Sequence, residues 1–454
     1  MPLAKDRDFL MRAARALVYL GLFAMPMLSL RVGGTGSGGI TISDVFFGMA
    51  IVPLALSKRR SRVLPTTVWN IGGVLVVVAG IVASFSAVTP RSSLLVDGRM
   101  VFVLFIWQWT LRHTLADKHR LVLGLDAYIS GAAVSGVVAI LQSKFHLIVS
   151  FGSTVNGRAF GLTTNPNDAG ATLSLGVVFA VGLVLYCGIG WRGYRAVCLG
   201  LISIGLILSG SVGGMGSALV GCFVLLVRHH VRPRTILVAA VAIVVIYVGG
   251  TSLLGSGPNG RSLNPIARFQ QASGNGTGQN TVNPRINTDK NAWSGIVASP
   301  VFGRGLDPAS GLVYYDPDLG VQYPTHNFIL TLWYQGGLVF LLGALIAIAA
   351  AFRRMLGARQ RNAGTDMIFA GAITVLLFTM QAPAMFDRYL WLPFVLAMTF
   401  PPWRKPALAD PRQRSAYSSN SRVNLERSTV MSLVIPAMTR SRAARGFPSP
   451  TRYR

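Results

Sequence analysis

The sequence predicts an all-α, polytopic transmembrane helix bundle, and three observations support this fold class. Of 454 residues, 52% are hydrophobic and only 13% are charged, and the mean hydropathy of +0.51 is too high for a soluble domain of this size. Apolar runs of roughly 20 residues, each long enough to cross about 30 Å of hydrocarbon, recur along the chain. Short basic connectors separate these runs. The chain is therefore expected to be a membrane protein.

About twelve helices are expected, one for each apolar run. In chain order the predicted spans are 13–30, 40–57, 68–88, 94–111, 121–141, 169–190, 196–212, 214–227, 235–254, 327–352, 366–384 and 386–402. One long extracytoplasmic loop, residues 255–325, separates the ninth helix from the tenth. Residues 1–402 thus form one helical domain. The remaining 403–454 are rich in Ser, Arg and Pro and are predicted to be a basic, disordered cytoplasmic tail.

The positions of Lys and Arg predict the orientation, because short loops rich in these residues stay in the cytoplasm. Basic clusters lie at the N-terminus and after the even-numbered helices, at 58–62, 112–120, 191–195, 228–234 and 353–361. Both termini are therefore placed in the cytoplasm. The net charge of +27 fits this pattern and contact with anionic lipid headgroups better than nucleic-acid binding, because 11 of the 42 basic residues lie in the tail and most others flank helices.

The cysteines and acidic residues argue against several other chemistries. Cys187, Cys198 and Cys222 lie inside apolar runs without CxxC spacing, so no disulfide, metal site or cofactor is expected. Glycoside hydrolysis needs a matched pair of carboxylates, and this chain has 15 acidic residues with a single glutamate in the tail.

A histidine and an asparagine stand at the threshold of one of the longest apolar runs. Burying His326 and Asn327 without partners would cost a few kcal/mol. The positive end of a helix dipole disfavours an imidazolium, so His326 could serve as a base that accepts a proton from a hydroxyl. Alternatively the two residues, with Thr325, only cap the helix. The residues alone favour capping.

The second half of the long loop predicts a short amphipathic helix at the membrane interface. In "PRINTDKNAWSGIVAS" (284–299), Ile286, Trp293 and either Ile296 or Val297 recur at helical spacing. Such a helix could hold two cations over the mouth of a cavity, or these cations could merely touch lipid phosphates. The cations are Arg285 and Lys290.

Two further polar motifs lie on the same predicted side. "NPND" supplies turn and capping chemistry through Asn165, Asn167 and Asp168, whereas Arg158 just before it has no such explanation. Asp387 and Arg388 begin the last helix, where they either pair with each other or bind a ligand. Arginine suits a diphosphate because its planar fork makes two charge-assisted hydrogen bonds at once. Several outer arginines thus point to an anionic, lipid-linked ligand.

Taken in order, three motifs resemble the O-antigen ligase and Wzy polymerase superfamily of multi-helix membrane enzymes. They are "GRAFGLTTNPNDAGATL", "NPRINTDKNAWSGIVASPVFGRGLD" and "PTHNFILTLWYQGGLVFLLG", and the likeness covers most of 13–402 in layout. The resemblance implies metal-independent, inverting glycosyl transfer at the outer face of the bacterial plasma membrane. The implied partners are a polyprenyl-diphosphate-linked glycan donor and a glycan or lipid-linked acceptor, with no nucleic acid.

Family roles carry over residue by residue. The resemblance makes His326, rather than a cap, the residue that activates the acceptor, and makes Arg285 a second catalytic candidate. The expected diphosphate-binding residues are Arg158, Arg285, Arg388 and Arg304. The expected supporting residues are Asn327, Asn165, Asp168 and Trp293.

One position departs from the pattern of relatives that carry a Ser-Arg pair near the outer end of the seventh helix. This chain reads "LSGSVGGMG", with Val212 where the arginine is expected. Either Arg388 or Lys290 replaces that cation, or the donor is held differently. Asp307, Asp316 and Asp318 could bind sugar hydroxyls or form turns. The competing interpretations are a lipid-linked oligosaccharide flippase and a non-catalytic assembly or sensor subunit. The sequence does not distinguish a ligase from a polymerase.

Overall fold

The computed structural model describes residues 2–32, 39–57, 66–148, 158–186, 191–228, 282–316, 321–357, 363–382 and 387–399. All of these belong to one compact unit, Met1–Pro402, and they are mostly helical. The predicted ninth helix at 235–254 and the predicted tail at 403–454 lie outside the described residues.

The described helices follow the predicted apolar runs closely. They are α1 (Pro2–Ala24), α2 (Ile42–Leu56), α3 (Thr67–Ser84), α4 (Pro90–Val101), α5 (Gln108–Thr114), α6 (Lys118–Phe145), α7 (Pro166–Tyr186), α8 (Arg192–Leu208), α9 (Val212–Arg228), α12 (Val282–Ala298), α13 (Phe328–Leu356), α14 (Ala363–Thr379) and α15 (Arg388–Ala397). A π-helical turn, Phe102–Trp107, joins α4 to α5 into one continuous segment.

Length and hydropathy confirm a membrane protein. Among the described residues, five segments are long and apolar enough to cross a bilayer: Thr67–Ser84, Pro90–Thr114, Lys118–Phe145, Pro166–Leu185 and Phe328–Leu356. Shorter apolar helices accompany them at Ile42–Leu56, Val212–Arg228 and Gly364–Thr379.

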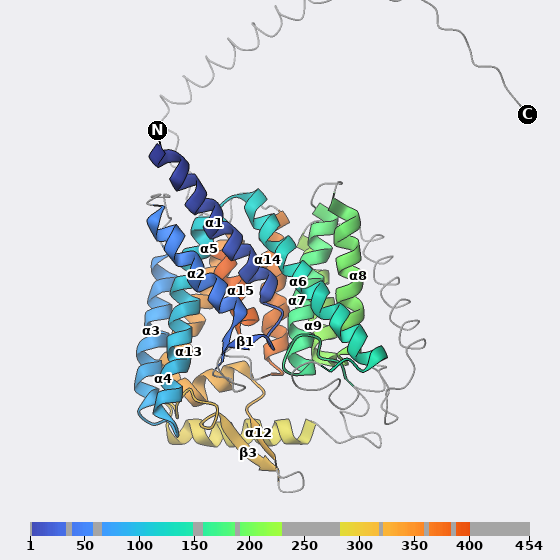
Figure 1. The fold of residues 1–454 in the computed structure, drawn as a ribbon. Coiled ribbons are helices and arrows are strands. Elements are labelled where there is room, and N and C mark those ends of the chain that lie inside the picture. Colours follow the sequence, from blue (N-terminus) through green and yellow to red (C-terminus); the bar gives the residue numbers. More distant parts are fainter. Residues whose placement is uncertain are drawn as a thin grey trace, which may run out of the picture. The chain divides into compact units, whose positions relative to one another are not determined.

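The bundle is held together by close backbone contacts and a buried central helix. A Cβ added at Gly72 of α3 would lie 2.6 Å from the carbonyl oxygen of Gly343 in α13, so only small residues allow these helices to approach. Every residue of α15 is buried, and this helix runs through the middle of the bundle (Figure 1). Arg388, the first residue of α15, is thereby held inside the protein.

Two short sheets depart from the all-α prediction. β1 (Arg31–Val32) pairs antiparallel with β2 (Ile40–Thr41), and β3 (Leu312–Asp316) pairs antiparallel with β4 (Val321–Pro324). The second hairpin is rich in Val and Tyr, whose β-branched or aromatic side chains suit extended backbone. Hydropathy averaged over helix-length windows does not detect strands this short.

The helix α12 lies across one end of the bundle, together with the β3–β4 hairpin (Figure 1). Ala292 and Ile296 of α12 are buried against Tyr334 of α13, so the first turns of α13 belong to this outer layer. We call α12, β3, β4 and residues 324–336 the α12 unit, and the end of the bundle that it covers the α12 end.

A break in α13 separates the α12 unit from the bundle. Gly337 has a φ of +79°, and its neighbour Leu338 donates from its backbone N–H to the Pro300 carbonyl (3.0 Å). The backbone N–H groups of Arg304 and Gly305 both donate to the Gln335 carbonyl at 3.0 Å. A Cβ at Gly337 would lie 2.1 Å from the Val301 carbonyl oxygen, so glycine is required here. The segment after α12 thus fills the break.

Candidate functional site

The N-terminus of α13 is capped by Asn327 and not by His326. The Oδ1 atom of Asn327 accepts hydrogen bonds from the backbone N–H groups of Ile329 (3.0 Å) and Leu330 (3.3 Å). The Oγ1 of Thr325 is buried without a hydrogen bond to the described residues. The capping function is therefore complete without the imidazole.

His326 itself is half-buried, and the Pro324 carbonyl lies near its ring. Its Nδ1 atom is buried and makes no hydrogen bond within the part of the chain that the structure describes. Burial, together with the positive charge of Arg285, lowers the pKa of His326 from 6.5 to about 4. The Pro324 carbonyl opposes this shift weakly. At neutral pH the ring is therefore uncharged and able to accept a proton.

Arg285 is the charge that acts on His326, and it lies near the start of α12. Its guanidinium is half-buried, and burial lowers its pKa, while the Asp289 carboxylate one turn along the helix opposes the shift. Arg285 forms no ion pair or side-chain hydrogen bond with the described residues, and the Oδ1 of Asp289 is also buried without a partner. A cation that is partly desolvated and has no bonded acid favours binding of an anion.

The fold of α12 explains how Arg285 reaches this position. Thr288 is fully buried and donates to the Arg285 carbonyl (2.7 Å), while Asn291 donates to the Val313 carbonyl of β3 (3.1 Å). The opposite face is exposed and apolar, with Ile286, Trp293 and Val297 at 46%, 51% and 65% exposure. The predicted amphipathic helix is therefore present. The buried position is Ile296, and Val297 belongs to the exposed stripe.

Two other predicted residues surround the same unit. Trp293 packs edge-on against Trp333 of α13, with ring centroids 5.8 Å apart. Arg304 is exposed, and its guanidinium lies over the Tyr334 ring at 5.6 Å. Trp293 and Arg304 thus pack on the α12–α13 contact that holds Arg285 and His326.

Arg158 has different surroundings. Its Nε donates to the Ser209 carbonyl (2.7 Å), and its Nη2 donates to the Oδ1 of Asn167 (2.9 Å). The side chain also packs on Gly210, whose φ is +57°. Ser209 and Gly210 form the junction that leads into α9 at Val212. Arg158 therefore brings a guanidinium to the very junction where the sequence lacks the expected arginine.

The "NPND" residues form the turn that the sequence predicts. The Oδ1 of Asn165 accepts from the backbone N–H groups of Asn167 (2.8 Å) and Asp168 (3.0 Å), which begins α7. The Oδ2 of Asp168 accepts from the hydroxyl of Thr164 (2.7 Å). Asn165 and Asp168 thus fix the turn, and Asn167 orients Arg158.

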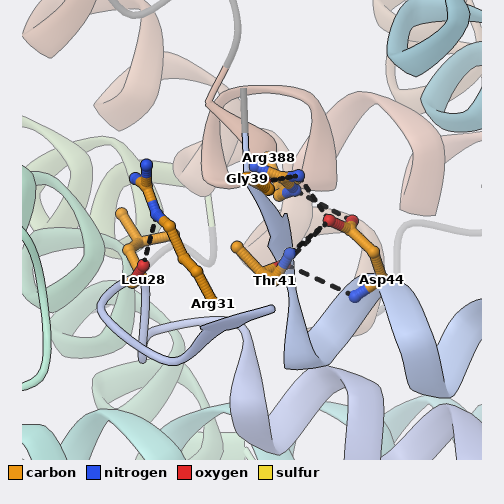
Figure 2. Close-up of polar contacts among 6 residues, drawn as sticks. All are labelled: Leu28, Arg31, Gly39, Thr41, Asp44 and Arg388. Carbon is orange, nitrogen blue, oxygen red and sulfur yellow. Dashed lines mark hydrogen bonds and ion pairs between the residues drawn. The ribbon is translucent and has the colours of Figure 1, made fainter. Parts of the chain in front are cut away.

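Arg388 does not pair with its neighbour Asp387. Its guanidinium makes a two-pronged ion pair with Asp44 of α2, with Nε 2.8 Å from Oδ1 and Nη2 against Oδ2 (Figure 2). Both side chains are nearly buried, at 8% and 11% exposure. Asp387 instead accepts a hydrogen bond from the Tyr389 hydroxyl (3.1 Å). Asp44, which is 344 residues away in the chain, therefore binds the arginine that was predicted from the sequence to bind phosphate.

Asp44 and Arg31 are residues that the sequence analysis did not identify. Asp44 also completes a capping box with Thr41 at the start of α2, and Arg31 donates from Nε to the Leu28 carbonyl (2.9 Å) (Figure 2). The charge of Arg31 acts on both Asp168 and Asp387. Two of the polar motifs therefore meet in one ion cluster at the α12 end. The pattern T-x-x-D at 41–44 signals the cap, but it does not reveal the partner Arg388.

Asp307 is fully buried and organises a turn. Its carboxylate accepts from the Thr89 hydroxyl (2.8 Å) and from the backbone N–H and hydroxyl of Ser310, at 3.2 and 2.5 Å. Of the two alternatives for Asp307, the turn is the one that the contacts support. The side chain of Asp316 and the whole of Asp318 lie outside the described residues.

A model of a known protein family matches part of the chain. Residues 196–345 match the family model described as O-Antigen ligase. The match confirms the resemblance that the motifs predict, and it supports an O-antigen ligase-like membrane protein of polysaccharide biosynthesis. No curated protein matches the chain. The O-antigen ligase segment contains Arg285 and His326, whereas Arg158 and Arg388 lie outside it.

Proposed function

We propose that this chain is a membrane glycosyltransferase of cell-surface polysaccharide biosynthesis. It transfers a glycan from a polyprenyl diphosphate to a sugar hydroxyl of a glycan or lipid-linked acceptor, at the outer face of the bacterial plasma membrane. Both termini lie in the cytoplasm. The α12 end then faces outward, because the segment carrying α12 follows an odd number of predicted spans.

The observation that carries this proposal is the pairing of Arg285 with His326. A half-buried guanidinium that forms no ion pair with an acid among the described residues lies close enough to an uncharged imidazole to lower its pKa. The first group suits an anionic leaving group, and the second suits proton removal from a hydroxyl. Both lie in the segment that matches the O-antigen ligase family.

The reaction uses these groups in one displacement. The acceptor hydroxyl loses its proton to His326 as its oxygen bonds to the anomeric carbon, and the bond from that carbon to the diphosphate oxygen breaks. Attack from the side opposite the diphosphate inverts the anomeric configuration. The polyprenyl diphosphate leaves with the bonding electrons, and Arg285 stabilises its growing charge, with Arg158 and Arg304 as further candidate contacts.

Donor binding also adjusts the base. With a pKa of about 4, His326 is a weak base in the free protein. A diphosphate beside Arg285 offsets the positive charge that lowers this pKa, so the imidazole becomes more basic when the donor is present. The protein thereby couples proton removal to occupancy of the donor site.

We further propose that the reaction needs no metal ion. Arginine fulfils the charge-neutralising role that a divalent cation has in many diphosphate-using enzymes. In the described ranges, no three His, Cys, Asp or Glu side chains lie close enough together to bind a metal. Incubation with EDTA is expected to leave the transfer rate unchanged, and a loss that added Mg²⁺ or Mn²⁺ restores would refute this part of the proposal.

The test is glycan transfer by the purified, reconstituted protein. Proteoliposomes receive a polyprenyl-diphosphate glycan and an acceptor, and elongated or ligated product is separated by size. The competing reading is a flippase, which moves the donor between leaflets without joining it to an acceptor. Movement of a labelled donor with no product from several donor and acceptor pairs would favour the flippase and refute the transferase.

A further inference from the structure

The start of α1 lies at the end of the bundle opposite α12 (Figure 1). A second cationic site lies there, between α1 and α6. A hollow of about 370 Å³ is lined by Asp8, Met11, Arg12 and Arg15 of α1 and by Arg120 in the first turn of α6. Three guanidinium groups thus face one carboxylate, so the hollow carries net positive charge. The proposed transfer chemistry makes no use of it.

The hollow is part of the packed fold. Leu22 of α1 packs on Gly124 of α6, where a Cβ would lie 3.0 Å from the leucine Cδ1, so the two helices touch just beyond the hollow. Met11 lines the hollow, and with Ala14 and Leu54 it is buried in a small apolar cluster. The contact of Leu22 with Gly124 and the burial of Met11 fix the distance between α1 and α6 at the hollow.

The neighbouring polar groups also come from both helices. The charges of Arg15, Arg120 and Asp117 all act on the Tyr19 hydroxyl, which places these groups around one point. The carboxylate of Asp117 is committed to the cap of α6, where its Oδ1 accepts from the His119 backbone N–H (2.9 Å). Among the described residues that line the hollow, three guanidinium groups thus outnumber one carboxylate.

Both helices that line the hollow also expose apolar side chains. Leu20 of α1 and Leu123 of α6, further along the same two helices, are 45% and 38% exposed. A ligand that fits both the cationic hollow and the exposed leucines has an anionic group next to hydrocarbon chains. A soluble phosphate or nucleotide would use the guanidinium groups but leave the apolar surface uncovered.

We propose that the hollow between α1 and α6 binds the phosphate headgroup of an anionic phospholipid, with Arg12, Arg15 and Arg120 as its ligands. Arginine forks make charge-assisted hydrogen bonds to phosphate oxygens, and basic pockets between helices bind such headgroups. The bound lipid joins α1 to α6 at this end of the bundle. The site needs only that the helices lie in a bilayer, so it is independent of the proposed transfer reaction.

The test compares two lipids with the same acyl chains on the full-length protein. Native mass spectrometry of detergent-solubilised protein mixed with equal amounts of phosphatidylglycerol and phosphatidylcholine is expected to show selective retention of phosphatidylglycerol. Arg12→Gln with Arg120→Gln should weaken that retention about tenfold, as expected for the loss of charge-assisted contacts. The matched control is Lys118→Gln with Arg192→Gln, which removes the same charge from two exposed residues outside the hollow.

Three results would overturn the proposal. The wild type could retain both lipids equally, or the Arg12 and Arg120 variant could retain phosphatidylglycerol as well as the wild type does. Retention of phosphatidylglycerol could also fall equally in the control, which would indicate that surface charge alone is responsible. Displacement of bound phosphatidylglycerol by inorganic phosphate, with phosphate then retained by the protein, would show a site for free phosphate instead. The pair Arg12→Lys with Arg120→Lys guards against misfolding, because it keeps the charge and should retain intermediate selectivity.

Discussion

Arg285 and Arg388 are both arginines at the α12 end, yet the protein treats their charges in opposite ways. Arg388 is nearly buried in a two-pronged ion pair with Asp44, so its charge is already compensated. Arg285 is half-buried beside His326 and is bonded to no acid among the described residues. A compensated cation stabilises the fold, whereas an uncompensated one is available to an anionic ligand.

The same contrast separates two regions of the molecule. At the α12 end of the bundle, the charged residues form an ion cluster in which Arg31, Asp44, Asp168, Asp387 and Arg388 act on one another. In the α12 unit, polar side chains such as His326 and Asp289 keep buried atoms without hydrogen bonds, and such atoms also occur in the bundle, for example at Ser43 and Asp97. Orphaned polar atoms cost stability, so their presence in a matched family segment is consistent with a ligand site.

The largest expected effect is on the imidazole. His326→Ala should lower the transfer rate by about a hundredfold to ten-thousandfold, because a positioned base contributes that much to catalysis. The fold should persist, since the ring makes no hydrogen bond that stabilises α13. The measurement is product formed by proteoliposomes at saturating donor, with circular dichroism and thermal unfolding as controls. A variant that folds and transfers at the wild-type rate would exclude His326 as the base.

The next effect sharpens the contrast between the two arginines. Arg285→Ala should lower kcat/KM for the donor by about a hundredfold, because a charge-assisted contact to the leaving group is lost. The matched control is Lys290→Ala, which removes an exposed cation five residues along α12 and should change kcat/KM little. Equal losses in the two variants would mean that general positive charge, and no particular clamp, supports donor use.

Arg285→Ala should also change the pH dependence of kcat/KM. Activity requires uncharged His326, so the acid limb of kcat/KM reports the pKa of this ring in the free protein, which is about 4. Removing the positive charge of Arg285 raises this pKa toward 6.5, although burial still holds it lower. The acid limb of Arg285→Ala should therefore move to higher pH. An acid limb that stays in place would show that the two groups are not coupled.

Substitutions in the Asp44–Arg388 ion pair should lower the stability of the protein without changing its affinity for the donor. Asp44→Asn leaves the Arg388 guanidinium buried without its acid and should cost about 3 kcal/mol of unfolding free energy. Thermal unfolding in a single detergent measures this, and the double variant Asp44→Asn with Arg388→Gln should recover part of the loss. If Arg388→Gln alone keeps normal stability but loses donor affinity, Arg388 belongs to the donor site after all.

The sequence predicts some parts of this molecule well and others poorly, for physical reasons. Helices α3, α6, α7 and α13 follow from apolar runs because a span through a bilayer must be long and nonpolar. The sequence does not predict the break at Gly337, because apolar residues on both sides of "QGG" fit one long span. The positive φ follows from the docking of residues 300–305 against this turn. The pairing of Asp44 with Arg388 could not be found, since no local pattern links residues so distant in the chain.

The candidate site was predictable in composition but not in geometry. His326, Arg285 and Arg158 stood out as polar residues without an ordinary explanation. Which of them come together depends on how α12 packs against α13, and that packing is set by Ala292, Ile296 and Tyr334. The sequence also left capping and catalysis open for His326 and Asn327. The structure assigns the cap to Asn327, and the catalytic role of His326 stays a proposal.

The smallest predicted effect tests that division of roles. Asn327→Ala removes the side chain that accepts from the Ile329 and Leu330 backbone N–H groups, so it should cost about 1 kcal/mol of unfolding free energy. Asn327→Asp and Asn327→Ser restore a capping oxygen and should recover most of that stability. Transfer per folded molecule should fall only a few-fold in all three, because the imidazole remains. If Asn327→Ala instead abolishes transfer as fully as His326→Ala while remaining folded, the asparagine contacts substrate, and the separation between a structural cap and a chemical base fails.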